Sequence, residues 1–179
     1  MRKLTADLVC AVESRVELPV EPRRLCEELC REMSGRQGRP IDLRIVPFPE
    51  ETGVTGLWLA MEDHDIILVE ERADPVQQLV ILGHELWHMK KGHCGSHHID
   101  GAAVAARAMS GETSLREVLI SVAARSHFRE AEESEAEAFG LFLGSKLRSW
   151  LAGPRARGPA TRDVVGGRIE ASLGYRGQG

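Results

Sequence analysis

Five consecutive residues near the middle of the chain constrain its fold more than any other feature. They are His84-Glu85-Leu86-Trp87-His88. Apolar residues around them recur at helical spacing, Asp74-Pro75 is a typical helix start, and two lysines followed by Gly92 are a typical helix end. The pattern therefore predicts one helix from about residue 75 to residue 91. Histidines four residues apart project from the same face of a helix, so both imidazoles can bind one metal ion.

The rest of the chain up to residue 153 predicts a single α+β domain. Helical patterns cover residues 4–18, 22–34, 115–124 and 129–151. Strand patterns cover residues 41–45, 54–60 and 65–69. A polar turn between the last two strands predicts a hairpin, and we expect a small antiparallel sheet packed on the helices. Residues 154–179 are rich in arginine and glycine and predict a basic tail outside the domain.

Composition excludes several classes of protein. Hydrophobic residues make up 42% of the 179 residues and charged residues 28%, which is typical of a globular protein. The net charge of −4 argues against a general nucleic-acid binder. We find no apolar run of the ~20 residues that a membrane span needs and no signal-peptide core, so we expect a cytoplasmic protein without membrane contact. The four cysteines are then expected to be thiols, with Cys26 and Cys30 as small buried apolar residues.

A tetrahedral catalytic metal site needs a third protein ligand and one open position. The acidic run at residues 130–137 offers the candidates. One face of the helix predicted there carries Glu133, Ala136, Glu137 and Gly140. The small residues on this face would let it approach the helix of the two histidines closely. We therefore predict Glu133 as the ligand and Glu137, one turn on, as the acceptor for a free ring N–H of one histidine. The alternatives for the ligand are Glu130, Glu132 and Glu135.

The two motifs together resemble the ImmA/IrrE family of metallopeptidases, over about residues 20–150. The second motif of that family has the form E-x-E-A-(N/D)-x-F-A, and residues 133–140 follow it with Glu137 and Gly140 as departures. The gap from His88 to Glu133 is also longer than usual, so residues 93–128 are expected to form an inserted element. The resemblance implies a zincin-like domain with Glu133 as ligand and Glu137 as supporting acid. Members of the family are commonly bacterial and phage regulatory proteases that cut a partner helix-turn-helix repressor.

The chemistry expected of such a site is hydrolysis of a peptide bond. Zinc held by His84, His88 and Glu133 would lower the pKa of a bound water towards ~7. Glu85 would take a proton as that water attacks the carbonyl, and would pass it to the leaving amine. The sequence leaves open which group stabilises the tetrahedral oxyanion. The candidates are His98 and His127, which could instead be ordinary surface histidines, whereas Tyr175, the single tyrosine, lies in the tail.

We therefore expect a zinc endopeptidase that cleaves a specific partner protein, a helix-turn-helix repressor by the resemblance. The alternative is a non-enzymatic regulator or a toxin–antitoxin component that binds protein or DNA. The intact Glu85 favours the enzyme, because a binding module needs no general base at that position. Cys94 follows the helix predicted for residues 75–91. It could occupy the open zinc position as a thiolate, which would keep the enzyme latent. An alternative role for Cys94 is that of an ordinary loop thiol.

Charge is distributed unevenly along the sequence, and this bears on partners. Seven acids lie around the expected sheet, and they could attract a basic DNA-binding repressor. They are Glu50, Glu51, Glu62, Asp63, Asp65, Glu70 and Glu71. The basic tail could contact nucleic acid, or it could be a solvated end of the chain. The sequence gives no indication of the oligomeric state.

Overall fold

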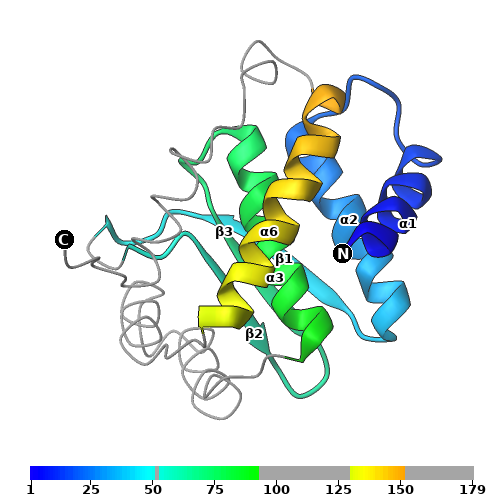
Figure 1. Ribbon diagram of the computed structural model, residues 1–179. Coiled ribbons are helices and arrows are strands. Elements are labelled where there is room, and N and C mark those ends of the chain that lie inside the picture. Colours follow the sequence, from blue (N-terminus) through cyan, green and yellow to red (C-terminus); the bar gives the residue numbers. More distant parts are fainter. Residues whose placement is uncertain (51–52, 93–129, 152–179) are drawn as a thin grey trace.

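The computed structural model describes residues 1–50, 53–92 and 130–151, which form helices and a small sheet (Figure 1). The elements in chain order are α1 (Arg2–Glu13), α2 (Pro22–Gln37), β1 (Ile41–Val46), β2 (Gly56–Ala60), β3 (Asp65–Glu70), α3 (Pro75–Lys91), α6 (Glu130–Leu147) and the short 3-10 helix η2 (Arg148–Trp150). The predicted α+β class is confirmed for these ranges. The predicted helix at 115–124 and the tail at 154–179 lie outside them.

The sheet is mixed, so the prediction of an antiparallel sheet is only partly right. Its strand order is β1-β3-β2. The pairing of β2 with β3 is antiparallel, as the predicted hairpin requires, but β1 pairs with β3 in parallel, with Ile41 opposite Asp65. Alternation of apolar and polar residues identifies a strand, yet it does not identify the neighbour of that strand. All six residues of β3 are buried, which fits its central place in the sheet.

Helix ends follow the local capping signals more closely than the apolar pattern. The α2 helix starts with Pro22 after Glu21, whose side chain accepts a hydrogen bond from the backbone N–H of Arg24. It ends at Gly38, which has the left-handed φ of 68°, and so runs past the predicted end at residue 34. The α1 helix stops at Glu13, short of its predicted end, although Val16 beyond it still packs against the core.

The α3 helix forms as predicted and occupies the centre of the fold. The side chain of Asp74 accepts hydrogen bonds from the backbone N–H groups of Val76 and Gln77 at its start. Gly92, with a φ of 64°, ends it. The helix packs against β2, β3, α2 and α6, and Figure 1 shows α6 crossing over it. Because neighbours surround α3, nearly all of its residues from Val76 to Met89 are buried.

Alternate residues of the sheet belong to two apolar clusters. Ile67 and Val69 join the main core, which also includes Leu82, Leu86 and Phe139 of the helices. The second cluster uses the intervening positions and is smaller. It consists of Phe48, Leu57, Leu59, Ile66 and Leu68. Both faces of the sheet are therefore buried. Within the three described ranges, no helix combines the length and the apolar character that crossing a membrane requires.

The described cysteines behave as the sequence predicts. Cys26 and Cys30 are free thiols buried on α2, and Cys10 is a free thiol at the surface. Burial raises the pKa of Cys26 to about 12, and burial likewise raises the pKa of Cys30. Both side chains join the main core, so they act as small apolar residues.

Candidate metal centre

Three buried side chains from two helices bring their ligand atoms together. His84 and His88 lie on α3, and their Nε2 atoms are 2.9 Å apart. Glu133 lies on α6, with Oε2 at 3.2 Å from Nε2 of His84 and Oε1 at 3.2 Å from Nε2 of His88. Each of the three residues is less than 8% exposed. The structure thus assembles the three residues that the sequence analysis selected as ligands, and this group could hold a metal ion.

The arrangement around Glu133 fits a metal better than it fits ordinary hydrogen bonding. Both carboxylate oxygens of Glu133 are buried and lack a hydrogen-bond partner within the described residues, although each lies near an imidazole nitrogen. A buried carboxylate is costly unless a cation compensates it. Ligand atoms about 2.0–2.1 Å from a tetrahedral zinc ion lie about 3.3 Å from one another, which is close to the separations seen here. Two imidazoles and one carboxylate also form a donor set suited to transition metals.

Glycine residues bring α3 and α6 close enough for this contact. A Cβ atom built on Gly83 would lie 2.8 Å from the Cα atom of Gly140, and one built on Gly140 would collide with the carbonyl oxygen of Val80. Beside the crossing, the rings of Trp87 and Phe139 stack with centroids 4.8 Å apart. The sequence analysis predicted the contribution of Gly140 but missed Gly83. The signal was available, because a glycine in the middle of a helix lowers its stability and calls for a packing reason.

The carboxylate of Glu85 is buried between the group of His84, His88 and Glu133 and the sheet. The backbone N–H of Trp58 donates a hydrogen bond to it, and Oε1 would lie 2.6 Å from a Cβ atom built on Gly56. Burial raises the pKa of Glu85, and this effect outweighs the opposing effects of the two histidines and of the Trp58 hydrogen bond. Glu85 thus lies against the first strand residues of β2. Sequence reasoning missed this contribution of Gly56 and Trp58, because it depends on how the strand packs on α3.

Glu133 and His88 shift each other's pKa in opposite directions. Burial alone would raise the pKa of Glu133, but the imidazoles of His84 and His88 lower it to about 2. Burial alone would lower the pKa of His88, but the carboxylates of Glu133 and Glu85 raise it above 6.5. Without a metal ion, the group is therefore stabilised as a carboxylate beside a protonated imidazole.

Glu137 was predicted to accept a ring N–H from His84 or His88, and the hydrogen bond from His84 is not formed. Nδ1 of His84 is buried and has no hydrogen-bond partner within residues 1–50, 53–92 and 130–151. Glu137 is half-buried on the next turn of α6 after Glu133. A supporting role for Glu137 stays a prediction.

The other carboxylates considered for the third ligand do not converge on the two histidines in the described part of α6. Glu135 is at the surface, where its Oε2 atom lies 3.3 Å from Nζ of Lys91. Glu132 is half-buried and does not belong to the converging group. The side chain of Glu130 lies outside the described part of the chain, as do the four other residues that the sequence analysis considered for the oxyanion or for the open zinc position. They are Cys94, His98, His127 and Tyr175.

Two of the acids predicted to form an acidic surface are neutralised instead. Asp65 is buried, and it accepts hydrogen bonds from Nε of Arg39 and Nε1 of Trp58. Glu70 is buried as well and is bonded to Arg72. The exposed acids among those predicted are Glu50, Glu62, Asp63 and Glu71, while Glu51 lies outside the described residues. The acidic surface is therefore smaller than the sequence suggests.

Comparison with protein-family models, with curated proteins and with solved structures gives no significant match to this chain. The resemblance to the ImmA/IrrE family therefore rests on the two motifs alone and stays a prediction. The convergence of His84, His88 and Glu133 is independent of that resemblance, because it follows from the positions of the side chains.

Proposed function

We propose that this chain is a zinc-dependent endopeptidase with a zincin-like fold, related to the ImmA/IrrE metallopeptidases, that cleaves a specific partner protein. One observation carries the proposal. A buried carboxylate that is not needed as a ligand, Glu85, lies beside the converging atoms of His84, His88 and Glu133. A site built only to bind metal for stability would have no use for a buried acid at this place.

The residues of the site divide into ligands and a proton carrier. His84, His88 and Glu133 would hold the ion through three atoms and leave the fourth tetrahedral position open. When bound, zinc supplies a Lewis acid that polarises a peptide carbonyl and lowers the pKa of water. Glu85 accepts a proton from the water that attacks the carbonyl carbon. When the C–N bond breaks, Glu85 gives that proton to the leaving nitrogen and returns to its starting state. Burial raises the pKa of Glu85 above the ordinary value of a carboxyl group, which favours its role as proton carrier.

The position of β2 favours a peptide as the substrate. Within the described sheet β2 pairs only with β3, so its other edge can pair with an extended segment of another protein. Gly56 and Trp58 of the same strand contact Glu85. A segment added along this edge would therefore pass close to Glu85 and to the metal ligands.

A helix-turn-helix repressor as the partner follows from the resemblance and from charge. Such proteins carry basic surfaces, and the exposed acids Glu62, Asp63 and Glu71 lie on the turn after β2 or directly after β3. Opposite charges speed encounter between proteins, mainly at low salt. We expect cleavage of the repressor to slow as salt concentration rises.

The test combines zinc-loaded protein with the helix-turn-helix protein encoded beside it. The parent protein should cut this partner at one or a few defined bonds. The Glu85→Gln variant should lose at least about 100-fold in rate while its zinc content stays the same, because a general base contributes about 10²–10⁴. Release of the repressor from DNA by both forms without cleavage would contradict the peptidase and support a non-enzymatic regulator.

A further inference from the structure

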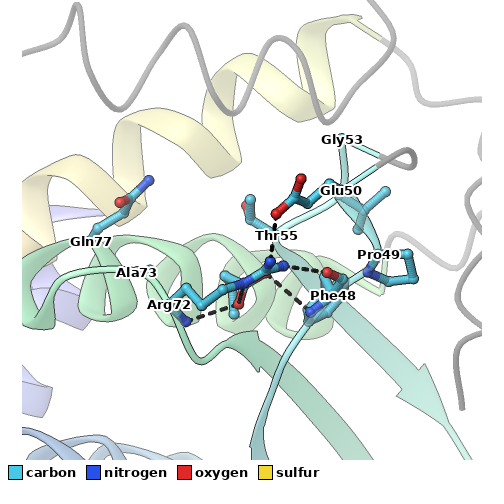
Figure 2. Close-up of a pocket in the computed structure, with 10 residues that line it drawn as sticks. Phe48, Pro49, Glu50, Gly53, Thr55, Arg72, Ala73 and Gln77 are labelled. Carbon is cyan, nitrogen blue, oxygen red and sulfur yellow. Dashed lines mark hydrogen bonds and ion pairs between the residues drawn. The ribbon is translucent and has the colours of Figure 1, made fainter.

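A pocket of about 320 Å³ opens at the Gly56 end of β2. Figure 2 shows it between the segment that joins β1 to β2 and the segment that joins β3 to α3. Apolar side chains on its walls include Phe48, Pro49 and Val54. Polar groups come from Glu50, Thr55 and Arg72, among others. The pocket therefore combines apolar walls with charged groups, as binding sites for amphipathic side chains do.

The pocket lies in line with the proposed path of the substrate. Thr55, on its wall, directly precedes the edge strand whose first residue contacts Glu85. Gln77, also on its wall, lies on α3 about two helical turns before Glu85. Eight residues of helix at about 1.5 Å each span roughly 12 Å. An extended peptide covers this length in three or four residues at about 3.3 Å each.

The charges in the pocket leave one acid available to a ligand. Glu70 is buried, and its two oxygens accept hydrogen bonds from Arg72 and from the backbone N–H of Phe48. Arg72 also donates to Oε1 of Glu50 at 2.9 Å. The side chain of Glu50 is 85% exposed, and an ion pair so open to water contributes little to stability. Glu50 can therefore turn to another cation, while Glu70 cannot.

We propose that this pocket is a specificity subsite for a lysine or arginine side chain of the substrate, three or four residues from the bond that is cut. The apolar stem of that side chain packs against Phe48 and Val54, and its cationic head binds Glu50. The inference rests on the proposed peptidase function and adds to it the sequence that the enzyme selects.

The experiment uses a randomised peptide library and the zinc-loaded protein, with cleavage products read by mass spectrometry. Lysine and arginine should be enriched about fivefold at one position three or four residues from the cut, the discrimination expected of a partly exposed charge pair. Glu50→Lys should remove this enrichment and favour acidic residues there. Glu17→Lys, an equal change of charge at an exposed acid between α1 and α2, should leave the enrichment unchanged.

A second arm separates failure of the subsite from failure of the peptidase. The zinc-loaded Glu85→Gln variant is used to select library peptides by binding, with and without Glu50→Lys. If no form of the protein cuts any peptide, the proposed function is wrong, and enrichment of basic residues among the bound peptides still supports the subsite. If the cleaved or bound peptides show no preference for basic residues, the proposed subsite is wrong. It is also wrong if that preference is the same in Glu50→Lys. Neither result contradicts the peptidase function.

Discussion

Gly83 of α3 and Gly140 of α6 face each other so closely that a Cβ atom on Gly83 would lie 2.8 Å from the Cα atom of its counterpart. Gly83 directly precedes His84, and Gly140 lies two turns after Glu133 on its helix. The contact between these glycines therefore sets the separation of the two helices that carry the proposed ligands. Any side chain at this crossing would push the carboxylate away from the imidazoles.

Gly140→Ala should destabilise the protein and weaken metal binding. The added methyl group would meet the carbonyl oxygen of Val80, and overpacking of this kind costs about 1–3 kcal/mol. We expect a lower free energy of unfolding in urea and at least about tenfold weaker zinc binding. The matched control is Gly35→Ala in α2, where nothing lies within 4 Å of the added atom. That change should stabilise the protein by about 0.5–1 kcal/mol. Similar behaviour of both variants would contradict the role of the crossing.

Glu133→Gln should remove most of the bound metal. A neutral amide replaces the charged oxygens that face both imidazoles, so we expect less than about a tenth of the parent's zinc content after dialysis, measured by elemental analysis. Glu135→Gln is the control, because Glu135 lies two residues along the same helix and pairs with Lys91 at the surface. Full zinc content in Glu133→Gln would show that another residue provides the third ligand.

Gly56→Ala should impair catalysis without removing the metal. The new methyl group would lie 2.6 Å from Oε1 of Glu85, so the carboxylate has to move away from its place beside Trp58. We expect kcat to fall about 10–100-fold while KM and zinc content change little. The double variant Gly56→Ala, Glu85→Asp relieves the contact with residue 85, because aspartate is shorter by one methylene group. It leaves the contact with Cγ2 of Ile81, which lies 2.5 Å from the added atom. If the double variant is slower than Gly56→Ala alone, the result contradicts this placement of Glu85.

The stability of the metal-free protein should peak at mildly acidic pH. The raised pKa of His88 adds stability that is complete below pH 6.5 and is lost as pH rises through the raised value. The lowered pKa of Glu133 adds stability that is present above pH 4.5 and is lost as pH falls towards about 2. Both contributions act together between pH 4.5 and 6.5.

Urea unfolding of chelator-treated protein across this pH range would check the peak, with Glu133→Gln as the variant that should flatten it. Added zinc should have the opposite pH dependence, because it binds neutral imidazoles and displaces their protons. The gain in stability on adding zinc should therefore grow from about pH 5.5 to pH 8. A gain that is independent of pH would exclude His88 as a ligand.

Local signals in the sequence predicted α3 and the convergence of His84, His88 and Glu133 well. Asp74-Pro75 and Gly92 define the ends of a helix through short-range capping, and the four-residue spacing of His84 and His88 is a property of that helix alone. Glu133 could be selected among several acids because it shares a helix face with Ala136, which is fully buried. Each of these inferences depends on contacts within a few residues of chain.

Features that depend on distant parts of the chain were missed or wrong. The parallel pairing of β1 with β3 could not be read from the alternating pattern at residues 41–45, because that pattern is the same for either direction. The neutralisation of Asp65 by Arg39 and the contact of Gly56 with Glu85 join residues more than twenty positions apart. Such contacts are fixed only when the sheet packs on α3.

The division of the proposed ligands between α3 and α6 would give a bound metal ion a second effect. His88 and Glu133 are separated by a long stretch of chain, so an ion bound to both closes a large loop, as a covalent cross-link would. An ion that binds only the folded state stabilises it, and this stabilisation grows with the concentration of free ion. Scarcity of zinc in the cell would then reduce the amount of this protein through degradation, as well as its activity.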